Sequence, residues 1–247
     1  MAQFLRHLTL LAVGLRLLWP AAPLCAQTTS PATAKDGLSF TVYAPVESPA
    51  WDRLYYLVGP KEPIKLVFQN NRRSKPITIT GAPKPLVFCV ERIDPVSHQK
   101  TYLPIGEAAW PESAVNALVV FTASSGTNPQ VRVTGIDDDL KVFPVRSVRF
   151  FNVTDVPLLA KVAEFQGKVP PGISPAHPYT VKSEDPSIVG VFSLAIAIND
   201  PKQGPRLLYN GNGDAWPRGR SLVFILPFAQ GSTDLRLRVL VDTPPST

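Results

Sequence analysis

The segment from Tyr209 to Trp216 has the residue types best suited to holding a ligand. It reads Tyr-Asn-Gly-Asn-Gly-Asp-Ala-Trp, so amides and a carboxylate alternate with glycines and end at a tryptophan. Amides and carboxylates hydrogen-bond hydroxyl groups, and an indole ring covers the apolar face of a sugar. A carbohydrate-binding loop is therefore one hypothesis, and its candidate ligand-binding residues are Asn210, Asn212, Asp214 and Trp216. Glycine and asparagine also form turns, and Trp216 has a counterpart in Trp110, so the sequence favours a turn whose tryptophan plugs the core against residues such as Leu194 and Phe224.

Three consecutive aspartates, Asp137 to Asp139, are the densest acidic run in the chain. Calcium needs several oxygens that converge on one point, whereas the side chains of consecutive residues diverge. The run therefore predicts a solvated strand end, with a calcium site between two domains as the alternative. No metal ligand and no cofactor is expected.

Catalytic residues are scarce. Outside the first 26 residues there are two histidines, His98 and His177, and the chain has no Gly-x-Ser-x-Gly motif and no zinc-type ligand spacing. Cys89 falls at a small-residue position on the less apolar face of its predicted strand, which favours a packing role over a reactive or intermolecular thiol. The sequence predicts that the protein is not an enzyme.

Composition limits the elements that could position these residues. Hydrophobic residues make up 45% of the 247 residues, and there are 27 prolines, about twice the usual share of roughly 5%. Proline breaks helix interiors, so a helical bundle is excluded and short strands with proline-rich turns are expected. The formal net charge is +6, and the basic residues are scattered, so no nucleic-acid partner is expected.

The chain also repeats itself. Ala109-Trp110-Pro111 and Ala215-Trp216-Pro217 each follow an Asp-Pro pair at the same spacing, 106 residues apart in the two copies. The strands that follow match at an offset of 104, and the segment at Tyr55–Leu57 aligns with Arg149–Phe151 at an offset of 94. The rise of the offset from 94 at the front of the repeat to 106 at the tryptophan motif predicts a 12-residue insertion in the second copy, between residues 167 and 186.

These observations predict an all-β chain of two tandem, internally duplicated immunoglobulin-like β-sandwich domains. The first repeat is predicted over 52–139 and the second over 146–243. Residues 27–51 form an N-terminal segment with a possible edge strand at Leu38–Tyr43. Asp155–Gly167 has helix-forming residues, but its counterpart in the first copy has a strand pattern, so a strand is favoured there.

Residues 1–26 have the order of regions typical of a secretory signal peptide: a basic start, an apolar stretch and small residues up to Ala26. Cleavage after Ala26 is predicted, with a lipoprotein anchored at Cys25 as the less favoured alternative. The apolar stretch is too short for an uncleaved anchor, so no transmembrane span is expected after cleavage. The mature protein would be periplasmic or secreted in a bacterium.

Three phrases of the second half resemble uncharacterised exported β-sandwich proteins of verrucomicrobial-type bacteria: residues 148–155, Val169-Pro170-Pro171-Gly172, and Trp216-Pro217 leading into 220–224. The resemblance implies no specific activity. The predicted function is a non-enzymatic exported binding or envelope-assembly module with a protein or glycan partner in the cell envelope. The alternatives are a carbohydrate-binding protein that uses the Asn210–Trp216 loop, and a periplasmic pilus-type chaperone.

Overall fold

The structure is a computed structural model that describes residues 37–58, 63–80, 85–123, 131–185, 187–200, 204–227 and 234–244. The predicted signal peptide and Cys25 lie outside these residues. Within the described ranges the chain is all-β: its only helical element is the short 3-10 helix η1 (Pro49–Arg53). None of the helical segments in this part of the chain is long and apolar enough to cross a membrane.

Each half of the chain contributes two sheets, both four-stranded in the first half and one four-stranded and one five-stranded in the second. In the first half the strands are β1 (Leu38–Tyr43), β2 (Leu54–Leu57), β3 (Pro63–Lys65), β4 (Ile77–Ile79), β5 (Leu86–Ile93), β6 (Lys100–Ala108), β7 (Asn116–Ala123) and β8 (Val131–Asp137). In the second half they are β9 (Ser147–Asn152), β10 (Leu158–Val162), β11 (Phe165–Val169), β12 (Gly172–Ile173), β13 (His177–Pro178), β14 (Gly190–Asp200), β15 (Gly204–Ala215), β16 (Arg220–Pro227) and β17 (Leu235–Asp242).

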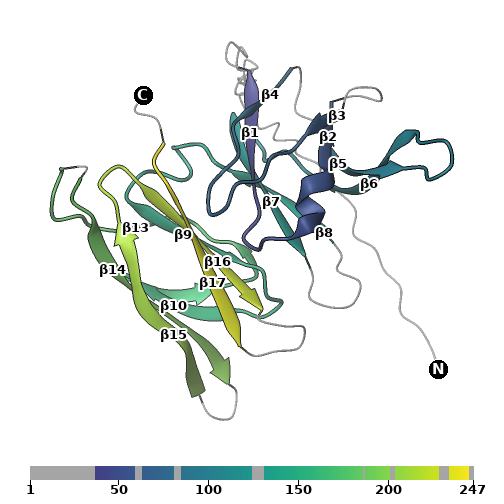
Figure 1. Cartoon of the computed structure of the whole chain (residues 1–247). Coiled ribbons are helices and arrows are strands. Elements are labelled where there is room, and N and C mark those ends of the chain that lie inside the picture. The colour runs from purple at the N-terminus through teal and green to yellow at the C-terminus, as the bar shows by residue number, and fades with distance from the viewer. Residues whose placement is uncertain are drawn as a thin grey trace, which may run out of the picture. The chain divides into compact units, whose positions relative to one another are not determined.

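The strand order is the same in both halves (Figure 1). The first half forms sheets β4-β1-β7-β8 and β3-β2-β5-β6, and the second forms β12-β9-β16-β17 and β11-β10-β14-β15, with β13 also paired to β9. In each half the first strand runs parallel to the second-last, β1 beside β7 and β9 beside β16, while the other pairs are antiparallel. The repeat expected from the sequence is therefore present in the topology.

A serine in each half fixes the residue-level correspondence. The Ser74 hydroxyl accepts a 2.9 Å hydrogen bond from the amide of Val42, and the Ser74 amide donates to the Val42 carbonyl. Ser174 makes the same two bonds with Phe150, at 2.9 and 2.8 Å. Both serines stand in a proline-containing segment that cannot supply a full ladder of amides, so the hydroxyl continues the pairing with the strand.

This correspondence corrects the front of the predicted repeat. Val42 pairs with Val119 and Phe150 with Val223, so β1 corresponds to β9 and the offset of 104 between β7 and β16 holds. Tyr55–Leu57 lies in β2, whose counterpart is β10, so its alignment with Arg149–Phe151 is wrong. The first repeat therefore starts at Leu38 and not at 52, and β1 is an interior strand between β4 and β7, not an edge strand. Apolar strands of similar length look alike in sequence, which produced the wrong match.

Asp155–Gly167 is strand, as favoured. It forms the hairpin β10–β11, in which Val162 pairs with Phe165 across a two-residue turn. Ala163 takes the left-handed conformation in that turn (φ 47°). β11 and β12 occupy the region where an insertion was expected, so residues 167–186 are not a single inserted loop.

The core consists of three apolar clusters. One lies between the two sheets of the first half and includes Phe40, Phe88 and Phe121; a second lies between the two sheets of the second half and includes Phe150 and Leu194. A third joins the halves: Tyr43, Leu118 and Val120 from the first pack with Phe151, Leu222 and Phe224 from the second. The sheets containing β7 and β16 are thus covered on both faces, which explains their unbroken apolar sequences.

Candidate functional site

Asn210, Asn212 and Asp214 lie on strand β15, not on a loop. All three are exposed, and they alternate with the less exposed Gly211 and Gly213, so they share one face of the strand. On the neighbouring strand β14 they are opposite Ala195, Ser193 and Val191, respectively. The structure therefore brings three of the four predicted residues together in a row.

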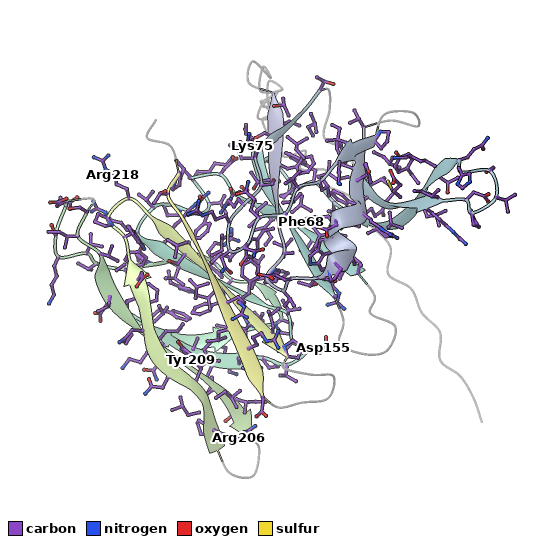
Figure 2. The ribbon with its side chains drawn as sticks, in the orientation of Figure 1. Phe68, Lys75, Asp155, Arg206, Tyr209 and Arg218 are labelled. Carbon is purple, nitrogen blue, oxygen red and sulfur yellow. The ribbon has the colours of Figure 1, made fainter. Side chains whose placement is uncertain are left out.

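Aromatic rings explain why this glycine-rich sequence forms a strand. A Cβ atom on Gly213 would come within 2.4 Å of the Phe192 ring, and one on Gly211 would come within 2.6 Å of the Tyr209 hydroxyl. Each ring covers a glycine, supplying the packing that the glycine itself lacks. Tyr209 and Arg206 are labelled along β15 in Figure 2.

Trp216 follows the end of β15 and is half-buried. Its indole nitrogen is buried and has no hydrogen-bond partner among the described residues. Leu194 and Phe224 belong to two different apolar clusters, and neither cluster includes Trp216 among its members, so the packing of Trp216 against both stays a prediction. Trp110 occupies the equivalent connection, between β6 and β7, and there the indole nitrogen donates a 2.9 Å hydrogen bond to the carbonyl of Ala114.

β15 is an edge strand, because it pairs only with β14 in the order of its sheet. Edge strands in natural proteins are commonly protected by charges, prolines or shortness. Between Arg206 and Asp214, β15 has seven consecutive residues with neither charge nor proline, the longest such stretch on any described edge strand. Its counterpart β6 is interrupted by Pro104 at a register shift. The edge of β15 is the least protected of those that the structure describes.

The acidic run is not a solvated strand end. The Asp138 carboxylate lies between Arg73 and Arg220, and Arg220 also contacts Asp242 at 2.9 Å. The Arg220 side chain is only 4% exposed and further donates to the carbonyls of Asp138 and Phe143. These charges sit where the two halves meet, so their role is to join the halves. Sequence spacing could not predict this, because the partners are up to 169 residues apart.

Asp139 has a separate structural role. Its carboxylate accepts hydrogen bonds from the amides of Val115 and Asn116, each at 2.9 Å. Burial opposes ionisation of this group, but the hydrogen bonds from the Val115 and Asn116 amides and the Asn116 side chain, with the charge of Lys141, together hold the pKa of Asp139 below its ordinary value. No group of three or more metal-ligating side chains occurs in the described part of the chain.

The residues considered for catalysis are dispersed. Cys89 is fully buried, and burial raises the pKa of its thiol, which fits the packing role. His177 lies on β13 with its ring stacked 3.6 Å from that of Phe165, and burial lowers its pKa. His98 lies in the turn between β5 and β6, on a different element.

One polar cluster was missed by the sequence analysis. On the sheet of β2 and β5, the Glu91 carboxylate accepts hydrogen bonds from Lys100 and from the Tyr55 hydroxyl, and Tyr102 packs edge-on against Tyr55. The bonds from Lys100 and Tyr55 hold the pKa of Glu91 below its ordinary value. Cross-strand neighbours of this kind depend on register, which the sequence pattern does not specify.

A shallow cavity of about 380 Å³ lies at one end of the β10–β14 pair. Its walls are mostly apolar, with Lys168 and Asn199 as the polar members. No charged or polar side chain in it is buried, so it has the form of a surface hollow more than of a built binding site.

No protein-family model matches this chain, and no curated protein matches it.

Proposed function

We propose that this protein is a non-enzymatic binding or envelope-assembly module, exported to the periplasm or beyond, that pairs an extended partner segment with the free edge of β15. In this mode a partner strand adds to an exposed sheet edge, and main-chain hydrogen bonds provide most of the affinity. The observation that carries the proposal is the unprotected stretch Leu207–Gly213, which has no equivalent on β6.

The neighbouring side chains support this use. Leu207 on the same strand is 57% exposed, so this edge also offers a partner an apolar side chain. The rings of Phe192 and Tyr209 cover Gly213 and Gly211, and the pairing of β15 with β14 is regular from Tyr209 to Ala215, beyond a register shift at Leu208. A partner backbone could therefore approach closely along this stretch.

The proposal includes two features predicted from the sequence, the immunoglobulin-like fold class and the export of the chain. A periplasmic pilus-type chaperone would use the same chemistry, because it too exchanges an edge strand with its partner. The envelope-assembly module and the chaperone would bind different partners, but both would use the free edge of β15.

Carbohydrate binding is the second candidate. It is favoured by the row of Asn210, Asn212 and Asp214 on one face of β15, where amides and a carboxylate are exposed together. The half-buried Trp216 would offer a ligand its ring face and not its indole nitrogen, which is buried.

A triple alanine variant, N210A/N212A/D214A, separates the two candidates. It removes the polar side chains and leaves the backbone edge intact. We expect peptides selected from a displayed library of extended sequences to bind both the parent and the variant, and to slow hydrogen exchange in 207–215. A library that yields no peptide protecting β15 overturns the edge proposal. Retention of a glycan by the parent and its loss in the variant would establish carbohydrate binding instead.

A further inference from the structure

We propose that the partner of β15 is β15 of a second copy of this chain, paired antiparallel about a twofold axis at Asn212. This inference rests on the proposed function, because it assigns an occupant to the same edge. In the resulting symmetric dimer the sheet β11-β10-β14-β15 of one copy is continuous with the same sheet of the second copy.

The sequence of β15 is self-complementary in this register. With Asn212 opposite Asn212 of the second copy, Asn210 faces Asp214 and Gly211 faces Gly213, each pair occurring twice. The Asn210 amide can donate to the Asp214 carboxylate, a charge-assisted hydrogen bond. Asp214 is the only charged residue from Leu207 to Ala215, and here it never faces another charge.

Neighbouring registers are poorer. An axis at Gly211 would place the Asp214 carboxylate opposite Leu208, and an axis at Gly213 would place Asn210 opposite Trp216, beyond the end of the strand. The axis at Gly211 loses the amide–carboxylate pairs. The axis at Gly213 keeps an amide opposite Asp214, because Asn212 then faces it, but it pairs only Gly211–Ala215 of the strand. The register centred on Asn212 also pairs the full span from Tyr209 to Ala215.

The first half of the chain cannot form the same contact. Pro104 interrupts β6, and Lys100 and Glu107 add charges to that strand. Among the strands that the structure describes, each chain thus has one such edge, and a contact of an edge with itself closes as a dimer and does not extend into a fibre.

Cysteine cross-linking tests the axis directly. In the proposed dimer the two copies of residue 212 have Cα atoms about 4.5–5.5 Å apart, within the range that a disulfide spans. We expect N212C to form a covalent dimer on mild oxidation. The matched control is N210C, which faces residue 214 and should remain uncross-linked. Cys89 is fully buried and so does not compete.

A charge exchange tests the register by sedimentation of the full mature chain. N210D places a carboxylate opposite Asp214 twice, so we expect the dimer Kd to rise roughly tenfold or more. The double variant N210D/D214N restores the pairs with the partners exchanged, and its Kd should return close to that of the parent.

The outcomes separate the two proposals. A chain that stays monomeric while extended peptides still protect β15 overturns the dimer and leaves the edge function standing. A dimer that N210D does not weaken, or in which N210C cross-links as readily as N212C, overturns this register. A chain that neither dimerises nor binds peptides overturns both.

Discussion

At the scale of single residues, identical side chains in the two halves have different surroundings. Trp110 and Trp216 stand on equivalent connections, yet the indole of Trp110 donates to Ala114 and that of Trp216 has no partner among the described residues. A buried donor without a partner costs about 1–3 kcal/mol. Equivalence in topology therefore does not imply equal contributions to stability.

Replacing each tryptophan by phenylalanine tests this difference. W110F removes a hydrogen bond and leaves the Ala114 carbonyl to find another donor, whereas W216F removes a donor that is already unsatisfied. We expect W110F to lower the free energy of unfolding by about 1 kcal/mol more than W216F does. Urea denaturation of the two variants measures it, and equal losses would contradict the assignment.

The single residue His177 should make the stability of the folded protein depend on pH. Burial lowers its pKa in the folded state, so folding favours the neutral ring. The stabilisation is complete above the ordinary histidine pKa of about 6.5 and is lost as the pH falls from there through the lower folded pKa.

H177F keeps an aromatic ring against Phe165 and removes the titration. The parent should lose stability between about pH 7.5 and about pH 5, and H177F should lose less over the same range. Melting temperatures at both pH values provide the comparison. A variant whose melting temperature falls as much as that of the parent would show that other groups cause the loss.

At the scale of the strands, two kinds of contact allow glycine-rich and proline-rich segments to pair with their neighbours. Rings cover the glycines of β15, and serine hydroxyls replace missing backbone partners beside β1 and β9. The serine hydroxyls and the Phe192 ring act across strands, between residues distant in the sequence, whereas Tyr209 covers Gly211 within β15 itself. Together they keep the two halves regular despite the many prolines and glycines.

S74A and S174A test the serine device as a matched pair. Each substitution removes a buried hydroxyl that accepts a hydrogen bond from the backbone amide of Val42 or Phe150. We expect each variant to lose about 1–3 kcal/mol of unfolding free energy, with similar values in the two halves. Chemical denaturation measures the losses; a change within about 0.5 kcal/mol of the parent would mean that the hydroxyl is dispensable.

At the scale of the whole molecule, the two halves share an apolar cluster and a charged one. Tyr43, Leu118 and Phe224 contribute to the first, and Arg220 with Asp138 and Asp242 forms the centre of the second. Burial of both requires the halves to remain together. We therefore expect the parent to unfold in a single cooperative transition.

L118D and L222D disrupt the shared cluster from its two sides, since the two leucines occupy equivalent positions on β7 and β16. A carboxylate there is costly to bury, so the contact between the halves should open. Calorimetry should then show two transitions in each variant in place of one. Two transitions already present in the parent would contradict the coupling.

R220A is expected to be among the most harmful single substitutions. It leaves the partly buried Asp138 and Asp242 with Arg73 alone, and because full burial of an ion pair makes the loss of one partner cost about 3–5 kcal/mol, we expect a loss toward the lower end of that range. R72A, at an exposed neighbouring position, provides the control. Equal melting temperatures for R220A and R72A would mean that the cluster does not stabilise the fold.

The sequence was enough for the all-β class, the repeat around Trp110 and Trp216, the strand at Asp155–Gly167 and the packing role of Cys89. The all-β class follows from proline content and period-two hydrophobicity, and the others follow from comparing the two copies along the chain. The tertiary structure decided what depends on pairing between distant segments. It placed Leu38–Tyr43 in the interior of a sheet, paired Asp138 with Arg73 and Arg220, and made Asn210–Asp214 an edge strand and not a loop. Strand order and register are set by contacts between residues far apart in the chain, and a pattern with a period of two is the same for every strand that could occupy a given place.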